Sequence, residues 1–128
     1  MKPEPRMSPP LTVESEQRGE KTLVKVSGEV QSGNAHILDE GLEKSIGEGD
    51  RAVVDMSGVS LMTSPGLGLL IKHTERLRDP ERMILAGLRP KVLDVFRALG
   101  LDHFFLITDT VEQGLELLSG IEGERKRG

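Results

Sequence analysis

The sequence predicts an α/β protein with a mixed, mostly parallel sheet, about four helices and an N-terminal β-hairpin at one edge of the sheet. Two observations support this class. A length of 128 residues suits one compact domain. After two neighbouring strand-like segments, helical and strand periodicities alternate along the chain, which implies right-handed crossovers and parallel pairing.

Five segments have the pattern of strands. The first two alternate between apolar and polar residues and flank the turn RGEK, so they should pair as a hairpin. The last three are short apolar runs, typical of buried strands. The expected strands are 11–17, 22–28, 51–58, 82–88 and 104–108. Their aliphatic pairs should be buried, namely Val53–Val54, Ile84–Leu85 and Leu106–Ile107.

Four segments have the spacing or the start signals of helices. These helices should begin near Asn34, Ser64, Arg89 and Thr110. Serine is a preferred N-cap and proline is common at the first helical position, so Ser64 and Pro65 fit a helix start without any further function. Gly66 and Gly68 would let this helix approach the sheet closely.

The domain itself is expected over residues 11–119. Residues 1–10 contain four prolines, which predicts a flexible N-terminal lead. Residues 120–128 are polar and are interpreted as a C-terminal tail. No apolar run reaches the ~18 residues of a membrane span, and the N-terminus lacks the apolar centre of a signal peptide. We therefore expect a cytoplasmic protein without direct membrane insertion.

Composition excludes several functions. Without cysteine, the chain has no disulfides, thiolate metal sites or cysteine catalysis. Aromatic residues make up 2% and the net charge is −4, so neither base stacking nor phosphate attraction favours a nucleic-acid partner. No histidines or carboxylates have a recognised ligand spacing, so we expect no metal and no cofactor.

No catalytic residue is predicted. A nucleophile elbow reads G-x-S-x-G, and Ser64 has glycine two residues after it but methionine two residues before it. His73 lies about 13 Å further along the same predicted helix, too far for a hydrogen bond to Ser64. Each histidine is interpreted as a lone surface residue. The G-x-G of residues 66–68 lacks the third glycine of a dinucleotide-binding loop.

Two roles are possible for Ser64, a helix cap and a phosphate acceptor. It heads a predicted helix at the end of a parallel strand. A phosphate there would meet unpaired backbone N–H groups and the positive end of the helix dipole, which is worth about 0.3–1 kcal/mol at an exposed site. The residue is thus both a suitable cap and a chemically suitable phosphate acceptor, with the Thr63 hydroxyl as a fallback.

The segment VVDMSGVSLMTSPGLGLLI, residues 53–71, resembles the signature of the STAS domain, found in bacterial anti-sigma factor antagonists. VSGEV at 26–30 and the stretch 85–118 resemble other parts of that domain, so the resemblance spans about residues 11–118. The residues that match the D-x-S-x-V part of the signature are Asp55, Ser57 and Val59; those that match its helix-opening part are Ser64, Gly66, Leu67 and Gly68.

The resemblance implies a STAS-like fold and a regulatory binding module rather than an enzyme. In this family the unphosphorylated antagonist binds an anti-sigma factor, often a serine kinase of the histidine-kinase-like ATPase fold, and so frees a sigma factor. The kinase can phosphorylate a serine that matches Ser64, which blocks binding until a phosphatase removes the phosphate. The implied docking surface consists of Gln31, Ser32, Gly33, Asn34, Met62, Thr63, Ser64, Pro65, Gly66 and Leu67.

Three positions depart from the family pattern. Thr63 and Gln31 stand where the family usually has aspartate, and Pro65 stands where it usually has serine or threonine. These departures favour an alternative, a STAS interaction module without phosphorylation in a multiprotein scaffold or a transporter complex. A nucleotide-binding or hydrolytic protein is a third hypothesis, which turnover dependent on Ser64 would support.

Overall fold

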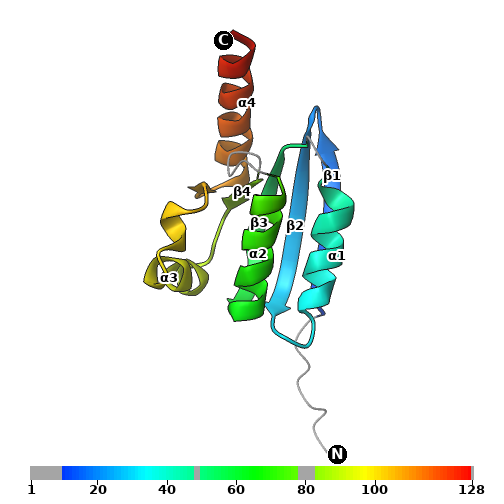
Figure 1. Ribbon diagram of the computed structural model, residues 1–128, viewed down its shortest axis with the longest axis vertical. Coiled ribbons are helices and arrows are strands. Elements are labelled where there is room, and N and C mark those ends of the chain that lie inside the picture. The colour runs from blue at the N-terminus through cyan, green and yellow to red at the C-terminus, as the bar shows by residue number, and fades with distance from the viewer. Residues whose placement is uncertain (1–9, 48–49, 78–82, 128) are drawn as a thin grey trace, which may run out of the picture.

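The computed structural model describes residues 10–47, 50–77 and 83–127, which form a five-stranded sheet and four α-helices (Figure 1). The strands are β1 (Thr12–Arg18), β2 (Lys21–Val30), β3 (Ala52–Met62), β4 (Met83–Ala86) and β5 (Ile107–Thr108). The helices are α1 (Ala35–Ser45), α2 (Ser64–Arg76), α3 (Pro90–Ala98) and α4 (Val111–Arg127), with a 3-10 turn at Leu101–His103. The predicted N-terminal lead lies, except for Pro10, outside the described residues.

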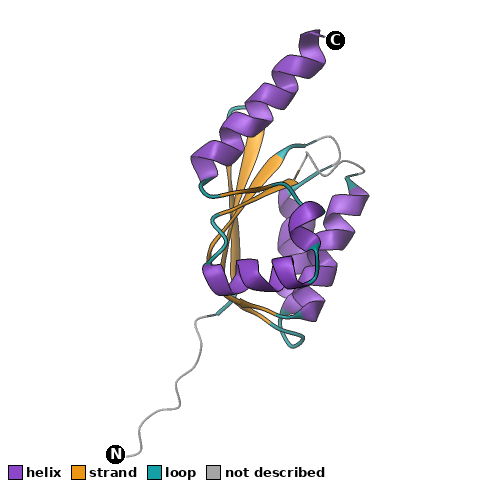
Figure 2. Cartoon of the chain, turned by 90° about the vertical axis from the view of Figure 1, so that its left-hand side faces the viewer, coloured by secondary structure: helices purple, strands orange, loops and turns teal. Residues whose placement is uncertain are grey.

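The sheet has the order β1-β2-β3-β4-β5. β1 pairs antiparallel with β2, and the three other pairings are parallel. Helices α1 and α2 lie side by side on one face, and α4 lies on the opposite face (Figure 2). The predicted mixed sheet with a hairpin edge is confirmed, because the alternation of strands and helices leaves room only for crossover connections after β2.

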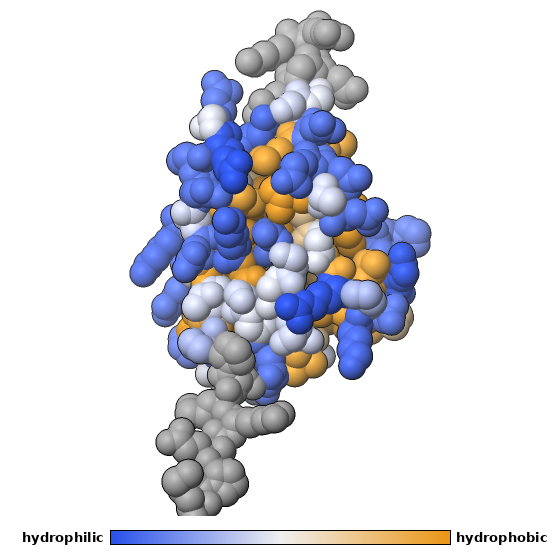
Figure 3. Space-filling model, turned by 180° about the vertical axis from the view of Figure 1, so that it is seen from behind, coloured by the Kyte–Doolittle hydropathy of each residue, from blue (hydrophilic) through white to orange (hydrophobic). Residues whose placement is uncertain are grey.

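Aliphatic side chains fill both faces of the sheet. The larger cluster joins the sheet to α1, α2 and α3, and the smaller one joins it to α4 through residues such as Leu118. The pairs Val53–Val54 and Ile84–Leu85 are fully buried, as predicted. The face seen from behind in Figure 3 is mostly covered by hydrophilic side chains, with smaller apolar patches between them.

The fifth strand is shorter than predicted. Only Ile107–Thr108 pair with β4, and the expected burial of Leu106 and Ile107 is wrong, since both are half-buried. Phe105 enters the core in their place and packs against Phe96 with ring centroids 5.7 Å apart. An aromatic ring buries more apolar area than either aliphatic side chain, which explains why the chain turns inward at this residue.

Helix α4 begins where the sequence predicts. The Thr110 hydroxyl accepts a hydrogen bond from the Gln113 amide at 3.1 Å, and the Gln113 side chain accepts one from the Thr110 amide at 3.1 Å. This reciprocal arrangement is a capping box. The helix continues to Arg127, so the backbone of residues 120–127, assigned to a polar tail, is helical, while the domain bounds 11–119 stay a prediction. None of the helices within the described ranges has the length and apolar character needed to cross a bilayer.

Candidate functional site

The two segments of the predicted docking surface meet at the carboxyl ends of β2 and β3. Val30 and Met62 are paired residues at the ends of these parallel strands. The next residue, Thr63, donates from its amide and from its hydroxyl to the Val30 carbonyl, both at 3.0 Å. The structure therefore brings the β2–α1 loop beside the start of α2, as the sequence predicts.

The β2–α1 loop is held by its own side chains. The Asn34 side chain accepts from the Gln31 amide at 2.8 Å and donates to the Glu29 carbonyl at 2.8 Å, so it fixes the loop rather than capping α1. The Gln31 side chain donates to the Glu29 carboxylate at 3.0 Å. A carboxylate therefore lies beside Gln31, two residues before the position where the family usually has aspartate.

Helix α2 begins at Ser64, as the sequence predicts, but its N-cap is the residue before. Thr63, not Ser64, occupies the N-cap position, and its hydroxyl bonds the Val30 carbonyl instead of capping the helix. Ser64 is the first helical residue and Pro65 the second. The role of Ser64 as the cap is therefore wrong. Its exposed hydroxyl has no hydrogen-bond partner among the described residues.

The predicted docking residues divide by burial. Those that face solvent are Gln31, Ser32, Gly33, Ser64 and Pro65, with Asn34 and Thr63 half-buried. The remaining residues, Met62, Gly66 and Leu67, lie in or against the core, and they support the exposed group from beneath. The surface that a partner could touch is therefore smaller than the predicted segment.

The two glycines of α2 have different environments. A Cβ on Gly66 would lie 2.2 Å from the Met62 sulfur and 2.7 Å from the Val30 Cγ1, so this glycine does allow close approach to the sheet. A Cβ on Gly68 would meet nothing within 4 Å, and the residue is exposed. The close-packing role predicted for Gly68 is wrong, because its position on the helix faces away from the sheet.

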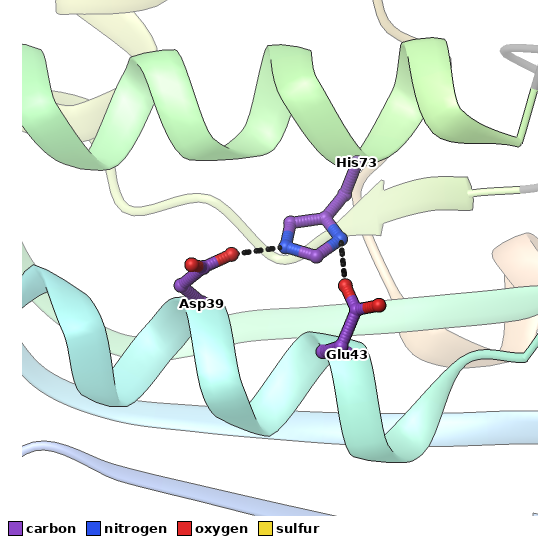
Figure 4. Close-up of side chains that lie close together, drawn as sticks. All are labelled: Asp39, Glu43 and His73. Carbon is purple, nitrogen blue, oxygen red and sulfur yellow. Dashed lines mark hydrogen bonds and ion pairs between the residues drawn. The ribbon is translucent and has the colours of Figure 1, made fainter.

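A second polar cluster lies in the middle of α1 and near the end of α2 (Figure 4). Fully buried His73 lies 2.8 Å from Asp39 through Nε2 and 3.9 Å from Glu43 through Nδ1. Arg76 donates to Nδ1 from Nε at 3.2 Å, and Lys72 donates to the same Asp39 oxygen at 2.9 Å. The interpretation of His73 as a surface residue is wrong.

Helical spacing contained the signal for this burial. Gly66, Leu70 and His73 on α2, and Leu77 directly after it, recur at intervals of four, three and four residues, and all four are buried. Asp39 and Glu43 lie one turn apart on α1, a spacing that places two carboxylates on one helix face. The pairing between the two helices could not be read from either spacing alone.

Electrostatics fix the protonation states in this cluster. Because Arg76 donates to Nδ1, the ring proton lies on Nε2 and is donated to Asp39. Burial lowers the pKa of His73, and the Arg76 and Lys72 cations lower it further, against the opposing effect of Asp39. Hydrogen bonds from Lys72 and His73 lower the pKa of the Asp39 carboxyl.

Asp39, Glu43 and His73 each place one atom of ligand type within 4.8 Å of the others, a spacing that a divalent cation could span. In this structure the same atoms serve the cations of the chain itself. Lys72 occupies the Asp39 oxygen, and Arg76 lies at 3.1–3.2 Å from Nδ1 and 3.6 Å from Glu43. The arrangement is therefore a hydrogen-bonded charge network, and a metal would first have to displace both side chains.

The chain matches the STAS domain family over residues 12–114. BtrV of Bordetella bronchiseptica, a protein assigned as an anti-sigma factor antagonist, is 29% identical over 89 residues, which cover 68% of this chain and 77% of BtrV. The crystal structure of an anti-sigma factor antagonist from Mycobacterium paratuberculosis is similar with a TM-score of 0.79 and 23% identity, over 86% of this chain and 95% of that one.

SpoIIAA, an anti-sigma factor antagonist, has also been solved. Its unphosphorylated form is similar with a TM-score of 0.65 and 19% identity, covering 85% of this chain and 97% of SpoIIAA. The phosphorylated form of SpoIIAA from Bacillus has a TM-score of 0.59 at 19% identity, over 82% and 97% of the two chains. At this identity the likeness shows a shared fold, the STAS fold predicted from the sequence.

Proposed function

The chain belongs to the STAS domain family, and on that basis we propose that it acts as an anti-sigma factor antagonist. It binds an anti-sigma factor, so that the sigma factor held by that protein is released, and phosphorylation of Ser64 ends the binding. The observation that carries the proposal is the exposed Ser64 hydroxyl at the start of α2, beside the β2–α1 loop; this hydroxyl makes no hydrogen bond to any residue that the structure describes.

Ser64 is a better acceptor than Thr63. The Thr63 hydroxyl is half-buried and donates to the Val30 carbonyl, so a kinase would have to break that hydrogen bond before phosphate transfer. Ser64 needs no such rearrangement. A phosphate on it adds about −1.5 to −2 charges at the start of a helix, where backbone amides without intrahelical partners favour an anion.

The same phosphate would act against partner binding. A partner that packs on the exposed residues of the β2–α1 loop and the first turn of α2 covers Ser64. Burying a dianion in that interface without a cation opposite it is unfavourable. Among the described residues of these two segments, 31–34 and 63–67, there is no arginine or lysine that could pair with it. Phosphorylation would therefore release the partner.

This proposal describes binding rather than catalysis. His73, on the same helix as Ser64, is buried and engaged by Asp39 and Arg76, so it is not available as a base for the Ser64 hydroxyl. The partner would be a serine kinase of the histidine-kinase-like ATPase fold in the cytoplasm, with a phosphatase that reverses its action. The purified chain should hydrolyse neither ATP nor esters above background.

The test uses the anti-sigma factor kinases encoded in the source genome, each incubated with the chain and ATP. Mass spectrometry should find one phosphate, mapped to Ser64, and Ser64→Ala should bind the same kinase but take up no phosphate. Thr63→Val is the matched control and should still be phosphorylated. Label on neither residue, together with an intact complex, would contradict the phosphoswitch.

That contradicting result would support the second candidate function. Gln31 and Thr63 replace the two aspartates that usually flank the acceptor in the family, so a kinase that reads those charges would lack its contacts. The chain would then be a STAS module that binds constitutively, in a multiprotein scaffold or as part of a transporter complex. A partner that binds Ser64→Ala and the natural chain equally, with and without ATP, is the expected outcome for this function.

A further inference from the structure

We propose that His73 is a proton-operated switch in a clasp that joins α1 to α2. The clasp consists of Asp39 and Glu43 on α1 and Lys72, His73 and Arg76 on α2. The two states of the switch differ in the side chain that is hydrogen-bonded to Nδ1 of the buried ring. It does not depend on the proposed partner, because every group involved belongs to this chain.

In the neutral state both ring nitrogens are satisfied. Nε2–H donates to Asp39 at 2.8 Å, and Nδ1 accepts from Arg76 at 3.2 Å from Nε and 3.1 Å from Nη2. Arg76 also donates from Nη2 to the carbonyl of Ile46, the residue directly after α1, at 3.0 Å. Arg76 thus connects the ring of His73 to the carboxyl end of the neighbouring helix.

Uptake of one proton from solvent at Nδ1 makes this arrangement impossible. Nδ1–H is then a donor and cannot accept from Arg76, and the imidazolium and the guanidinium repel each other at this distance. The acceptor that faces Nδ1–H is the Glu43 carboxylate, 3.9 Å away on a side chain that is 58% exposed. Protonation therefore exchanges Arg76 for Glu43 as the partner of the ring.

The exchange changes how the two helices are joined. Arg76 loses its acceptor on the ring and is repelled by the imidazolium, which displaces the guanidinium and weakens its hydrogen bond to the Ile46 carbonyl. Asp39 keeps the Nε2–H in both states, which leaves the middle of the clasp closed. The result is an α1–α2 pair that loosens at the carboxyl end of α1 while its centre stays fixed.

Charged groups surround the ring on both helices. Asp39 and Glu43 face it from α1, and Lys72 and Arg76 face it from α2. An open cleft between the helices, lined also by Glu40 and Lys44, brings solvent to the outer side of these groups. Burial and the two cations hold the pKa of His73 below its ordinary value, so the neutral state is the one present at neutral pH.

The experiment is a pH titration of the isotopically labelled chain, followed by imidazole ¹⁵N and arginine Nε–H signals in NMR spectra. At neutral pH, His73 should show a protonated Nε2 and a bare Nδ1. It should gain its second proton below about pH 6.5, the ordinary value for histidine. The Arg76 Nε–H should lose its protection from exchange at the same pH. A proton on Nδ1 at neutral pH, or Arg76 protection that stays constant through the titration, would overturn the proposal.

Two variants with a matched control separate the switch from simple burial. Glu43→Gln removes the charged acceptor for Nδ1–H and should lower the pH at which His73 titrates. Arg76→Gln removes a cation and should raise it. Glu40→Gln, a neighbouring carboxylate that lines the same cleft without contacting the ring, should leave the titration unchanged. Equal shifts in Glu43→Gln and Glu40→Gln would show that only the general charge of α1 matters and would contradict the exchange of partners.

Discussion

The two ends of α2 use their polar side chains in opposite ways. At the amino end, Ser64 is exposed without a hydrogen-bond partner among the described residues, and Gly68 presents bare backbone one turn later. Toward the carboxyl end, His73 and Arg76 are linked to α1 by several hydrogen bonds and ion pairs. We call the first of these, residues 64–68, the open end of α2, and the second, residues 73–76, its closed end.

This difference shows that the polar groups of one helix can be satisfied within the fold or left at the surface. Polar groups that serve the fold are satisfied within the chain, because an unsatisfied buried group costs free energy. The exposed Ser64 hydroxyl, in contrast, is accessible at the surface. The amino end of α2 adjoins the β2–α1 loop, whereas the His73 end is joined to α1 by hydrogen bonds and ion pairs.

The largest loss of stability should come from a substitution of Gly66, which lies beneath the open end. Gly66→Ala places a methyl group 2.7 Å from the Val30 Cγ1 and 2.2 Å from the Met62 sulfur. Overpacking of this kind costs about 1–3 kcal/mol in free energy of unfolding. Urea denaturation should show the loss as a lower midpoint with an unchanged slope. An unchanged midpoint would mean that α2 can move away from β3 at no cost.

A smaller loss should follow from weakening the closed end. In Asp39→Asn the amide oxygen can still accept from His73, but the charge that holds Lys72 and the ring is gone. We expect a loss of about 1 kcal/mol in the free energy of unfolding at neutral pH. Glu40→Gln serves as the control on the same helix. If both variants are equally stable, the clasp does not stabilise the fold.

The closed end should also make stability depend on pH. The folded-state pKa of His73 is lowered, so between that pKa and about 6.5 the unfolded chain binds more protons than the folded one. Stability should therefore fall as the pH drops from about 6.5 toward the folded-state pKa, and chemical denaturation at a series of pH values measures this slope. His73→Gln should flatten it. A slope that persists unchanged in that variant would assign the effect to other groups.

The smallest effect, of opposite sign, should come from the open end. Gly68→Ala removes the conformational cost of a mid-helix glycine without a clash, which should stabilise the chain by about 0.5–1 kcal/mol. Gly120 in α4 also has nothing within 4 Å of a built Cβ, so Gly120→Ala is the matched control. Thermal unfolding should show a similar gain for both. Destabilisation by Gly68→Ala alone would show a packing role that the structure does not contain.

The sequence was sufficient to predict the fold because its periodicities change cleanly at each element. Periodicity did not identify the N-cap residue of α2. Both Thr63 and Ser64 are good caps, and the choice between them depends on the Val30 carbonyl, which lies on another strand. The preferences of the neighbouring residues could not predict this hydrogen bond, because the bond forms only when β2 and β3 pair.

The closed end was missed for a related reason. The position of His73 on the buried face follows from helical spacing, but burial of a histidine requires polar partners, and Asp39 lies 34 residues away on α1. The opposite happened at Gly68. It was predicted to allow close approach to the sheet, but its position on the helix faces outward. Contacts between elements, rather than the elements themselves, set the limit of the sequence analysis.

The most direct test of the open end as a regulated docking surface is calorimetric titration of the cognate anti-sigma factor with charge variants of the chain. Ser64→Asp should bind more weakly than the natural chain by on the order of tenfold or more, because it places a carboxylate inside the interface. Ser119→Asp, an exposed serine on α4 at the opposite face, should bind normally. Unchanged affinity of Ser64→Asp, or an equal loss in both variants, would contradict the account.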